Sequence, residues 1–281
     1  MPIKNYKPNR AARKKMSIVD RSELYKGQPL KGLLASKTAT SGRGSAGKIT
    51  TRHRGGGVKR RLRVVSFGQE KLGITGTVEH IEFDPNRSAN LARVVYADGD
   101  RKYLLAWDGA KTGDTTITDE KTPEKEGNRM KLKNITPGLF VHNVEIKPGR
   151  GGSLFRSAGS YGILMDVQEG YAQIRMPSSE VRLISRESYA TIGTVGNPDW
   201  RLQRIGSAGR KRRLGLRPNV RGKVMNPVDH PHGGGEGAQS TGLKYPKTPW
   251  GKHALGVKTR KAGKYSDPMI LERRKNKRKK K

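Results

Sequence analysis

The middle of the chain alternates apolar and polar residues with a period of two, the pattern of half-buried β-strands. Residues 76–83 show this pattern most clearly. The alternation predicts two opposite faces of one strand, with Val78, His80 and Glu82 on the first and Thr77, Glu79, Ile81 and Phe83 on the second. Similar runs, which we also expect to be strands, cover residues 61–67, 91–96 and 101–106.

The turn between the last two of these runs contains Asp98-Gly99, a strong signal for a β-hairpin. Residues 109–127 are polar and acidic, and they predict a loop with at most one short strand near Ile117. No segment carries a long 3.6-residue period. We therefore expect little helix, limited to single turns near residues 185–189 and 201–205.

A second set of strand-like runs follows in the sequence. It covers residues 139–146, 162–167, 171–176 and 181–184. Turn residues such as Pro148-Gly149 and Glu169-Gly170 separate the runs, at the spacing of a small meander or barrel. We therefore predict an all-β protein with two small barrels that divide near residue 128, each with a small core.

The charge of the chain is concentrated at its two ends. The 281 residues hold 59 Lys and Arg against 24 Asp and Glu, a net charge of +35. Residues 1–63 carry 18 basic and 2 acidic residues, residues 64–199 carry 17 and 18, and residues 200–281 carry 24 and 4. A nearly neutral middle is therefore flanked by two cationic extensions, with net charges of +16 and +20.

The two extensions hold too few apolar residues to offset the backbone entropy of folding, about 1–2 kcal/mol per residue, and their like charges repel. We expect each of them to need a polyanion. Neither has an amphipathic apolar face with Trp or Phe anchors, which disfavours a membrane surface and favours nucleic acid. The chain has no run of 18 apolar residues, no signal-peptide core and no cysteine. We therefore expect a cytoplasmic protein of a bacterium, or one of an organelle, without disulfides.

Residues 42–48 match the pattern G-x-G-x-x-G and fall one residue short of a phosphate-binding P-loop. Ile49 stands where a P-loop has the Ser or Thr that holds Mg²⁺, and the flanking segments are polar. The hypothesis of a nucleotide-hydrolysing enzyme is therefore disfavoured. We interpret the glycines as a place where backbone N–H groups approach phosphate.

Residues 52–61 support the same interpretation more strongly. Gly55, Gly56 and Gly57 lack side chains, so the backbone fits a narrow groove, while the flanking arginines bind phosphates through two hydrogen bonds each. A solvated charge run is the simplest alternative. The matching run at residues 210–213 in the C-terminal extension makes that alternative less favoured.

Residues 229–236 bring His, Asp and Glu together, which raises the hypothesis of a metal or acid–base site. Pro231 stiffens the spacer and no further ligand is near in sequence, whereas zinc usually takes four ligands. We prefer a loop inserted into RNA, with imidazoles that stack on bases or hydrogen-bond to them. We expect His80 and His142 to be structural. Three aromatic side chains either stack on bases or pin the extension to a barrel: Trp200, Tyr245 and Trp250.

At these residues the chain resembles the bacterial type of the large-subunit ribosomal protein numbered two, over nearly its whole length. The motifs that carry the resemblance are TRHRGGG at 51–57, VHNVE at 141–145, RSAG at 156–159, ATIG at 190–193, RPNVRG at 217–222, MNPVDHPHGGGEG at 225–237, PWG at 249–251 and KTR at 258–260. The long run around His230 is the most specific of them. Three positions depart from the family pattern: Val58 replaces a usual His, Lys223 a small uncharged residue and Trp107 a common Pro.

The resemblance implies an OB-like barrel followed by an SH3-like barrel, with extensions buried in large-subunit rRNA. It implies a primary rRNA-binding protein that supports subunit association, tRNA binding and peptide-bond formation near the peptidyl transferase centre. Its partners would be large-subunit rRNA, small-subunit rRNA at the subunit interface and other ribosomal proteins, with no membrane, metal or cofactor. His230 matches a family histidine once proposed to act in peptidyl transfer. Since that reaction is attributed to RNA, we expect an rRNA contact there and no enzyme activity.

These arguments predict four parts: a basic N-terminal extension at 1–63, an OB-like barrel at 64–127, an SH3-like barrel at 128–199 and a basic C-terminal rRNA-binding extension at 200–281. A general basic nucleic-acid-binding protein is the alternative. The residues expected to bind rRNA are Arg43, Lys48, Arg52, His53, Arg54, Gly55, Gly56, Gly57, Lys59, Arg60, Arg61, Arg156, Arg201, Arg204, Arg210, Lys211, Arg212, Arg213, Arg217, Arg221, Lys223, Asn226, His230, His232, Trp250, Lys258 and Arg260.

Overall fold

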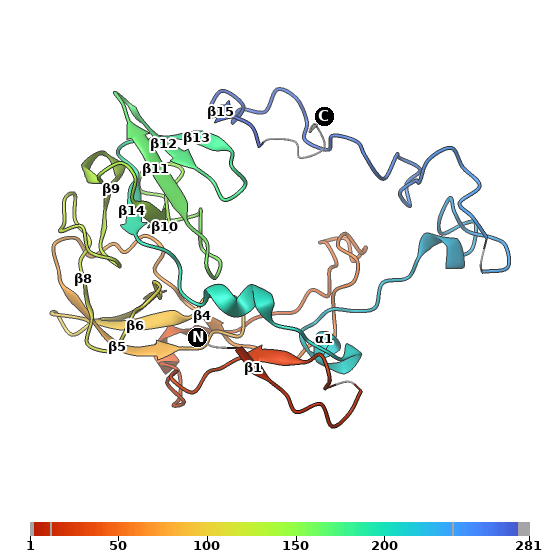
Figure 1. The fold of residues 1–281 in the computed structure, drawn as a ribbon, viewed down its shortest axis with the longest axis horizontal. Helices are drawn as coiled ribbons and strands as arrows, with labels where there is room; N and C mark the ends of the chain where they lie inside the picture. The colour runs from red at the N-terminus through yellow and green to blue at the C-terminus, as the bar shows by residue number, and fades with distance from the viewer. Residues whose placement is uncertain (1–2, 12, 238, 275–281) are drawn as a thin grey trace. The chain divides into compact units, whose positions relative to one another are not determined.

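Strands dominate the computed structural model, which describes residues 3–11, 13–237 and 239–274 (Figure 1). Within these residues the one α-helix is α1 (Ala208–Arg213), and the other helical turns are short 3₁₀ segments. None of the described helices has both the length and the apolar character needed to cross a membrane. The all-β class predicted from the two-residue period is confirmed.

The first main sheet has the strand order β7-β6-β5-β8 and is antiparallel throughout. Its strands are β5 (Gly76–Glu82), β6 (Leu91–Tyr96), β7 (Arg101–Leu105) and β8 (Thr115–Thr116). The predicted hairpin joins β6 to β7, and the Tyr96 N–H donates to the Asp100 carbonyl oxygen across it at 2.9 Å. This sheet corresponds to the expected OB-like part.

Strand β5 does not keep the predicted alternation over its whole length. Val78 pairs with Val94 and His80 pairs with Arg93, so Glu79 is an extra residue in β5. This β-bulge reverses the phase of the strand, and Val78 and Ile81, predicted on opposite faces, pack in one core cluster. The prediction of two strict faces is wrong because the periodicity of one strand does not show where its pairing slips by one residue.

The second main sheet has the strand order β15-β13-β12-β11-β10-β14-β9, and Figure 1 shows β11, β12 and β13 side by side. Its strands are β9 (Arg129–Lys131), β10 (Phe140–His142), β11 (Gly162–Val167), β12 (Tyr171–Arg175), β13 (Val181–Ser185), β14 (Tyr189–Ile192) and β15 (Ile270–Glu272). Fully buried apolar side chains such as Val141, Leu164 and Ile174 form its core. This sheet corresponds to the expected SH3-like part.

The helical turn expected near residues 185–189 is wrong. The chain makes a tight turn there, with the Ser188 N–H donating to the Ser185 carbonyl oxygen, and then enters β14. Strand β14 pairs with β9 on one side and β10 on the other, so its short backbone gains two sets of hydrogen bonds. A four-residue strand is too short to show a period, and only its neighbours define it. The other expected turn corresponds to η3 (Pro198–Leu202).

One ion pair lies inside the core of the second sheet. Arg129 and Glu145 are 0% and 2% exposed, and the Arg129 Nη2 lies 2.9 Å from the Glu145 Oε1. The Arg129 Nη1 donates to the Asn143 carbonyl oxygen, while the Glu145 Oε2 accepts from the Gly149 and Tyr189 N–H groups. Burial lowers the pKa of Arg129 to about 10, and the Glu145 charge opposes that shift. The pair fixes the strand β9 against the turn after β10.

His142 and His80 are both held within the barrels, where we expected structural roles. His142 is 1% exposed, and its Nδ1 donates to the Gly193 carbonyl oxygen at 3.0 Å. Burial lowers the pKa of His142 to about 4, although the hydrogen bond to Gly193 acts in the opposite direction. The His80 ring stacks on Tyr25 at 4.0 Å, which packs a segment of the N-terminal extension against β5.

The extensions are largely irregular, as predicted, with a few short elements. These are β1 (Ile3–Asn5), β2 (Ser17–Val19), η1 (Lys31–Leu33), β3 (Leu34–Ala35), β4 (Leu62–Arg63) and η4 (Gly222–Val224), while η2 (Leu132–Asn134) lies between β9 and β10. The strand expected at residues 61–67 is reduced to β4, because Val65 makes only an isolated bridge with Tyr103. From the C-terminal extension, β15 pairs with β13 at the edge of the second sheet.

The chain divides into two compact units. The barrel unit contains both main sheets and consists of the described residues of 1–38, 59–207 and 266–281. The cationic unit consists of Ala39–Val58 and Ala208–Tyr265. Each cationic extension therefore contributes to both units, which the linear map of charge did not reveal. The barrel limits at 64–127 and 128–199 remain predictions.

Candidate nucleic-acid interface

The cationic unit concentrates positive charge. Its two segments contain 18 Lys and Arg against two acidic residues, Asp229 and Glu236. Four of the six histidines of the chain also lie here: His53, His230, His232 and His253. Of the 27 residues expected to bind rRNA, 21 belong to this unit. The fold thus brings part of the charge of both extensions, 18 of their 42 Lys and Arg, into one unit.

Backbone hydrogen bonds hold the two segments of the cationic unit together. The Gly55 N–H donates to the Gly215 carbonyl oxygen, the Val58 N–H to that of Arg213 and the Arg217 N–H to that of His53. A Cβ on Gly57 would lie 3.1 Å from the Cα of Gly215, so a side chain there would press on the Gly215 backbone. The glycine triplet that we assigned to an RNA groove therefore also has a role within the protein.

The cationic unit has no apolar core. His230, at 7% exposure, is the one buried residue among those described in the unit. Large apolar side chains point to solvent instead, with Val228 at 96% and Trp250 at 74% exposure. The net contribution of one hydrogen bond to the stability of a fold is only about 0.5–1.5 kcal/mol. The cations of the unit also repel one another. We therefore expect bound anions to stabilise this conformation.

A groove of about 540 Å³ runs between the two segments of the cationic unit. Four arginines line it, Arg43, Arg52, Arg54 and Arg217, together with His53, Gly55 and Gly56. The described residues of the lining include no carboxylate. Arginine forks bind phosphate oxygens through paired hydrogen bonds, so the groove fits a nucleic-acid backbone. Seven residues predicted separately from two distant segments meet at this groove.

The P-loop-like segment at residues 42–48 forms a small hairpin next to this groove. Arg43 and Ile49 are bridged, the Gly44 N–H donates to the Lys48 carbonyl oxygen and the Gly47 N–H to that of Gly44. These two amides are engaged inside the hairpin and do not point to a ligand, so the backbone contact with phosphate remains a prediction for the rest of the segment. The side chains of Arg43 and Lys48 are exposed, and the phosphate contacts expected of them remain predictions.

Helix α1 carries the densest group of cations. Its last turn consists of Arg210, Lys211, Arg212 and Arg213, and the last three of these side chains are exposed. Cations near the C-terminus of a helix interact favourably with its carbonyl groups, which offsets part of their mutual repulsion. The helix therefore presents three exposed positive charges over a single turn.

The two histidines of the most specific motif act as acceptors for backbone amides. The His230 Nδ1 accepts from the His232 N–H at 3.0 Å, and the His232 Nε2 accepts from the Lys247 N–H at 2.8 Å. A backbone N–H is always a donor, so these two ring nitrogens carry no proton. Burial lowers the pKa of His230, and His232 and Arg52 lower it further. Both imidazoles therefore support the loop as hydrogen-bond acceptors.

Glycine makes room for the buried ring of His230. A Cβ on Gly222 would lie 2.5 Å from the His230 ring, a separation that side chains do not tolerate. The neighbouring Lys223, one of the departures from the family pattern, donates from Nζ to the Gln239 carbonyl oxygen at 3.0 Å. The loop around His230 is thus organised by contacts within the protein.

Trp250 lies at the tip of a tight turn. The Thr248 N–H donates to the Lys252 carbonyl oxygen and the Gly251 N–H to that of Thr248, and Lys247 bridges His253. The Arg52 guanidinium lies 5.9 Å from the centre of the Trp250 ring. The indole is carried by a hydrogen-bonded turn and is mostly exposed, as stacking on a base requires.

Six of the expected rRNA-binding residues lie in the barrel unit: Lys59, Arg60, Arg61, Arg156, Arg201 and Arg204. Arg60 donates to the Pro85 carbonyl oxygen at 2.8 Å, and the Arg156 guanidinium lies 4.4 Å above the Phe67 ring. These two arginines therefore have structural partners as well. The RNA contacts expected at all 27 positions remain predictions.

No described group of three or more His, Asp or Glu side chains is placed to hold a metal ion. Trp107, another departure from the family pattern, is 6% exposed in the first core and its ring covers Gly127. Val58, the third departure, is exposed.

Two family comparisons cover most of the chain. Residues 30–118 match the RNA-binding N-terminal domain of ribosomal proteins L2. Residues 125–251 match the C-terminal domain of ribosomal proteins L2. The matches include the first main sheet, most of the second and most of the cationic unit. Since the two matches together span more than half of the chain, it belongs to the ribosomal protein L2 family.

Proposed function

We propose that this chain is a structural constituent of the large ribosomal subunit and a primary rRNA-binding protein, with the cationic unit as its main RNA-binding surface. The observation that carries the proposal is the lack of an apolar core in a unit with a net charge of +16. Such a unit is stable as a compact body only when phosphates neutralise it. The groove of four arginines offers a site for them.

The barrel unit has a different part in this proposal. Residues 64–199, which include nearly all of both sheets, carry a net charge of −1. A folded, nearly neutral body adds little to electrostatic affinity but gives the protein a rigid shape, which fixes position and register on the RNA. The barrel unit as a whole carries +19, and this charge lies in its parts of the two extensions. These parts would add to phosphate binding, while residues 64–199 would fix placement.

The finer roles rest on the resemblance to the family. They are support of subunit association, tRNA binding and peptide-bond formation near the peptidyl transferase centre, with small-subunit rRNA and other ribosomal proteins as further partners. The geometry of His230 argues against a direct catalytic role, because the ring is buried and its Nδ1 already accepts a hydrogen bond. We propose that His230 acts by shaping the loop that meets rRNA.

Competition binding tests the proposal against a general nucleic-acid-binding protein. The labelled probe is a large-subunit rRNA transcript, and the competitors are unlabelled transcript, an unrelated transcript of equal length and duplex DNA, all at one salt concentration. We expect the specific transcript to compete far better than the other two, because base and shape contacts add to phosphate contacts. Equal competition by all three would refute the ribosomal assignment and favour the general binder.

A further inference from the structure

A second cavity lies in the barrel unit, and Arg204 is the one residue of its lining that we predicted to bind rRNA. It measures about 530 Å³, within the range of about 300–1,000 Å³ that small-ligand sites occupy. Ten residues line it: Ile3, Asn5, Tyr6, Pro8, Lys14, Lys15, Met16, Ser17, Leu202 and Arg204. None of them lies within the residues matched to the RNA-binding N-terminal domain.

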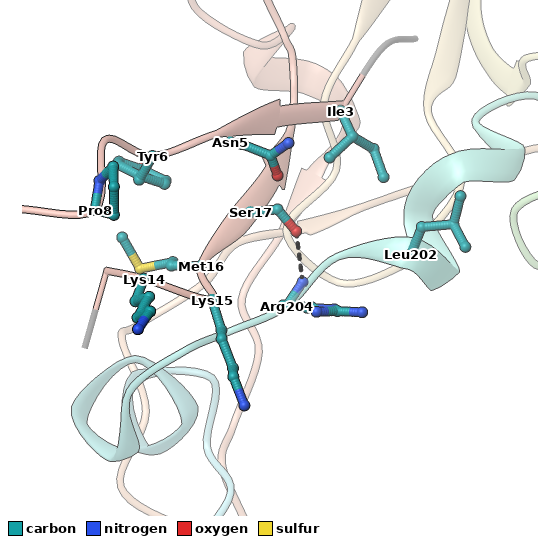
Figure 2. A pocket seen from close by; sticks show the side chains of 10 residues that line it. All are labelled: Ile3, Asn5, Tyr6, Pro8, Lys14, Lys15, Met16, Ser17, Leu202 and Arg204. Atoms are coloured by element: carbon teal, nitrogen blue, oxygen red, sulfur yellow. Dashed lines mark hydrogen bonds between the residues drawn. The ribbon is translucent and has the colours of Figure 1, made fainter. Parts of the chain in front are cut away.

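The cavity is built by a two-stranded ribbon and the end of η3. Strands β1 and β2 pair antiparallel, from Ile3 opposite Val19 to Asn5 opposite Ser17. The Ser17 N–H donates to the Arg204 carbonyl oxygen, and the Arg204 N–H donates to the Ser17 Oγ, both at 3.0 Å. This double contact fixes the chain after η3 beside the ribbon. Figure 2 shows the hydrogen bond between the Ser17 side chain and Arg204 as a dashed line.

Hydrogen bonds also hold the described residues on either side of residue 12 in the connection between the two strands. The Tyr6 N–H donates to the Met16 carbonyl oxygen, and the Met16 N–H donates to that of Arg13. The Lys14 N–H contacts the carbonyl oxygens of both Arg10 and Ala11. Lys14 and Lys15 therefore project from a braced turn and not from a loose tail.

The chemistry of the lining combines cations with apolar and aromatic surface. Three cations line the cavity, Lys14, Lys15 and Arg204, and its described lining contains no carboxylate. Figure 2 shows Tyr6, Pro8 and Met16 at one end and Ile3 and Leu202 toward the other. The side chain of Asn5 lies between them and has both a donor and an acceptor. An anion with a flat part that carries hydrogen-bonding edges fits this lining.

We propose that this cavity binds one unpaired nucleotide of rRNA. The lysines and Arg204 would hold its phosphate, the Tyr6 ring and the Met16 side chain would contact the base, and Asn5 would bond the base edge. Such recognition requires a base that is unstacked, since a paired base keeps its faces and edges inside the helix. The inference rests on the proposed rRNA-binding function and adds a site outside the cationic unit.

Photocrosslinking of the full chain tests this site. The probe is a single-stranded oligouridine of about 12 nucleotides, a length within the site sizes of single-strand binders, with 4-thiouridine at one position. After irradiation, the crosslinked peptides are mapped by mass spectrometry. We expect crosslinks at Tyr6, Pro8 or Met16, and their loss when the same oligomer is annealed to a complementary strand.

Matched variants separate the site from bulk charge. The test variant is Lys14→Gln with Lys15→Gln, and the control is Lys4→Gln with Lys7→Gln, which removes equal charge from the same ribbon at positions that do not line the cavity. We expect the test variant to lower the crosslink yield at the cavity at least tenfold more than the control. Tyr6→Phe keeps the ring and should retain the crosslink, whereas Tyr6→Ala should weaken it about tenfold or more.

Three competitors identify the source of the nucleotide. Competition by single-stranded RNA supports the proposal, and competition by free uridine monophosphate alone supports the nucleotide chemistry with a soluble ligand as the occupant. The proposal would be overturned if polyglutamate competed as well as single-stranded RNA, or if the test and control variants lost the same fraction of the crosslink yield. Wild-type preference for the rRNA transcript is measured in parallel, so that failure of this site is distinguished from failure of the proposed function.

Discussion

Removal of the three exposed cations of α1 should flatten the salt dependence of rRNA binding. The variant is Lys211→Gln, Arg212→Gln and Arg213→Gln. All three side chains are exposed, whereas Arg210 is half-buried and is left in place. Glutamine has a helix propensity close to those of lysine and arginine, so the helix itself should persist.

The magnitude follows from counterion release. Each phosphate contact contributes about 0.7–0.9 to the slope of log K against log salt, so three lost contacts should reduce the slope by about 2–3. Over a fourfold rise in salt, the wild-type protein should therefore lose about 20- to 40-fold more affinity than the variant. The expected effect is large because His230 is the one buried residue among those described in the cationic unit, so on our proposal binding rests on phosphate contacts.

The assay measures affinity for the large-subunit rRNA transcript at several salt concentrations. The matched control replaces Lys111, Lys121 and Lys125 with Gln, which removes the same charge from the acidic loop before β9. We expect the control to keep the wild-type slope. A wild-type slope in the α1 variant would refute the reasoning, and an equal change in the control would show that only total charge matters.

Two further predictions concern the barrel unit. The substitution Glu145→Gln should lower the free energy of unfolding of the barrel unit by about 3–5 kcal/mol, because Arg129 is left as a buried charge without its counterion. Urea unfolding measures this loss, with Glu187→Gln at an exposed ion pair as the control. An equal loss of stability in both variants would contradict the argument. His142 has a pKa of about 4 in the folded state against 6.5 when unfolded, so folding is favoured by the neutral form. The contribution of His142 to stability should be complete above pH 6.5 and fall by about 3 kcal/mol as the pH drops to 4. The variant His142→Gln should lack this decline. If the variant keeps the pH dependence of the wild-type protein, His142 is not its source.

Local signals predicted much of the barrel unit. Strand β6 and strand β11 have the limits expected from their apolar runs, and Asp98-Gly99 marks the hairpin between β6 and β7. These features depend on the conformational preferences of a few neighbouring residues, so one sequence contains the information. The bulge at Glu79 and the strand β14 depend instead on the partner across the sheet, and they were predicted wrongly.

The candidate interface shows the same division. Arginine- and glycine-rich motifs identified its members and the class of its partner, because charge and the lack of a side chain are properties of single residues. The joining of residues 39–58 to residues 208–265 had no such signal. Gly57 contacts the backbone of Gly215, and no feature of either residue predicts the other as its partner.

The sequence by itself therefore determined the all-β class, the polyanionic partner and the residues that bear the charge. Only the tertiary structure decided that parts of both extensions form one unit, that His230 is buried as a support for its loop, and that a cavity opens between the β1–β2 ribbon and the residues after η3. The physical reason is that charge and local conformation are set within a few residues. Hydrogen bonds and close packing between distant segments exist only after the chain has folded.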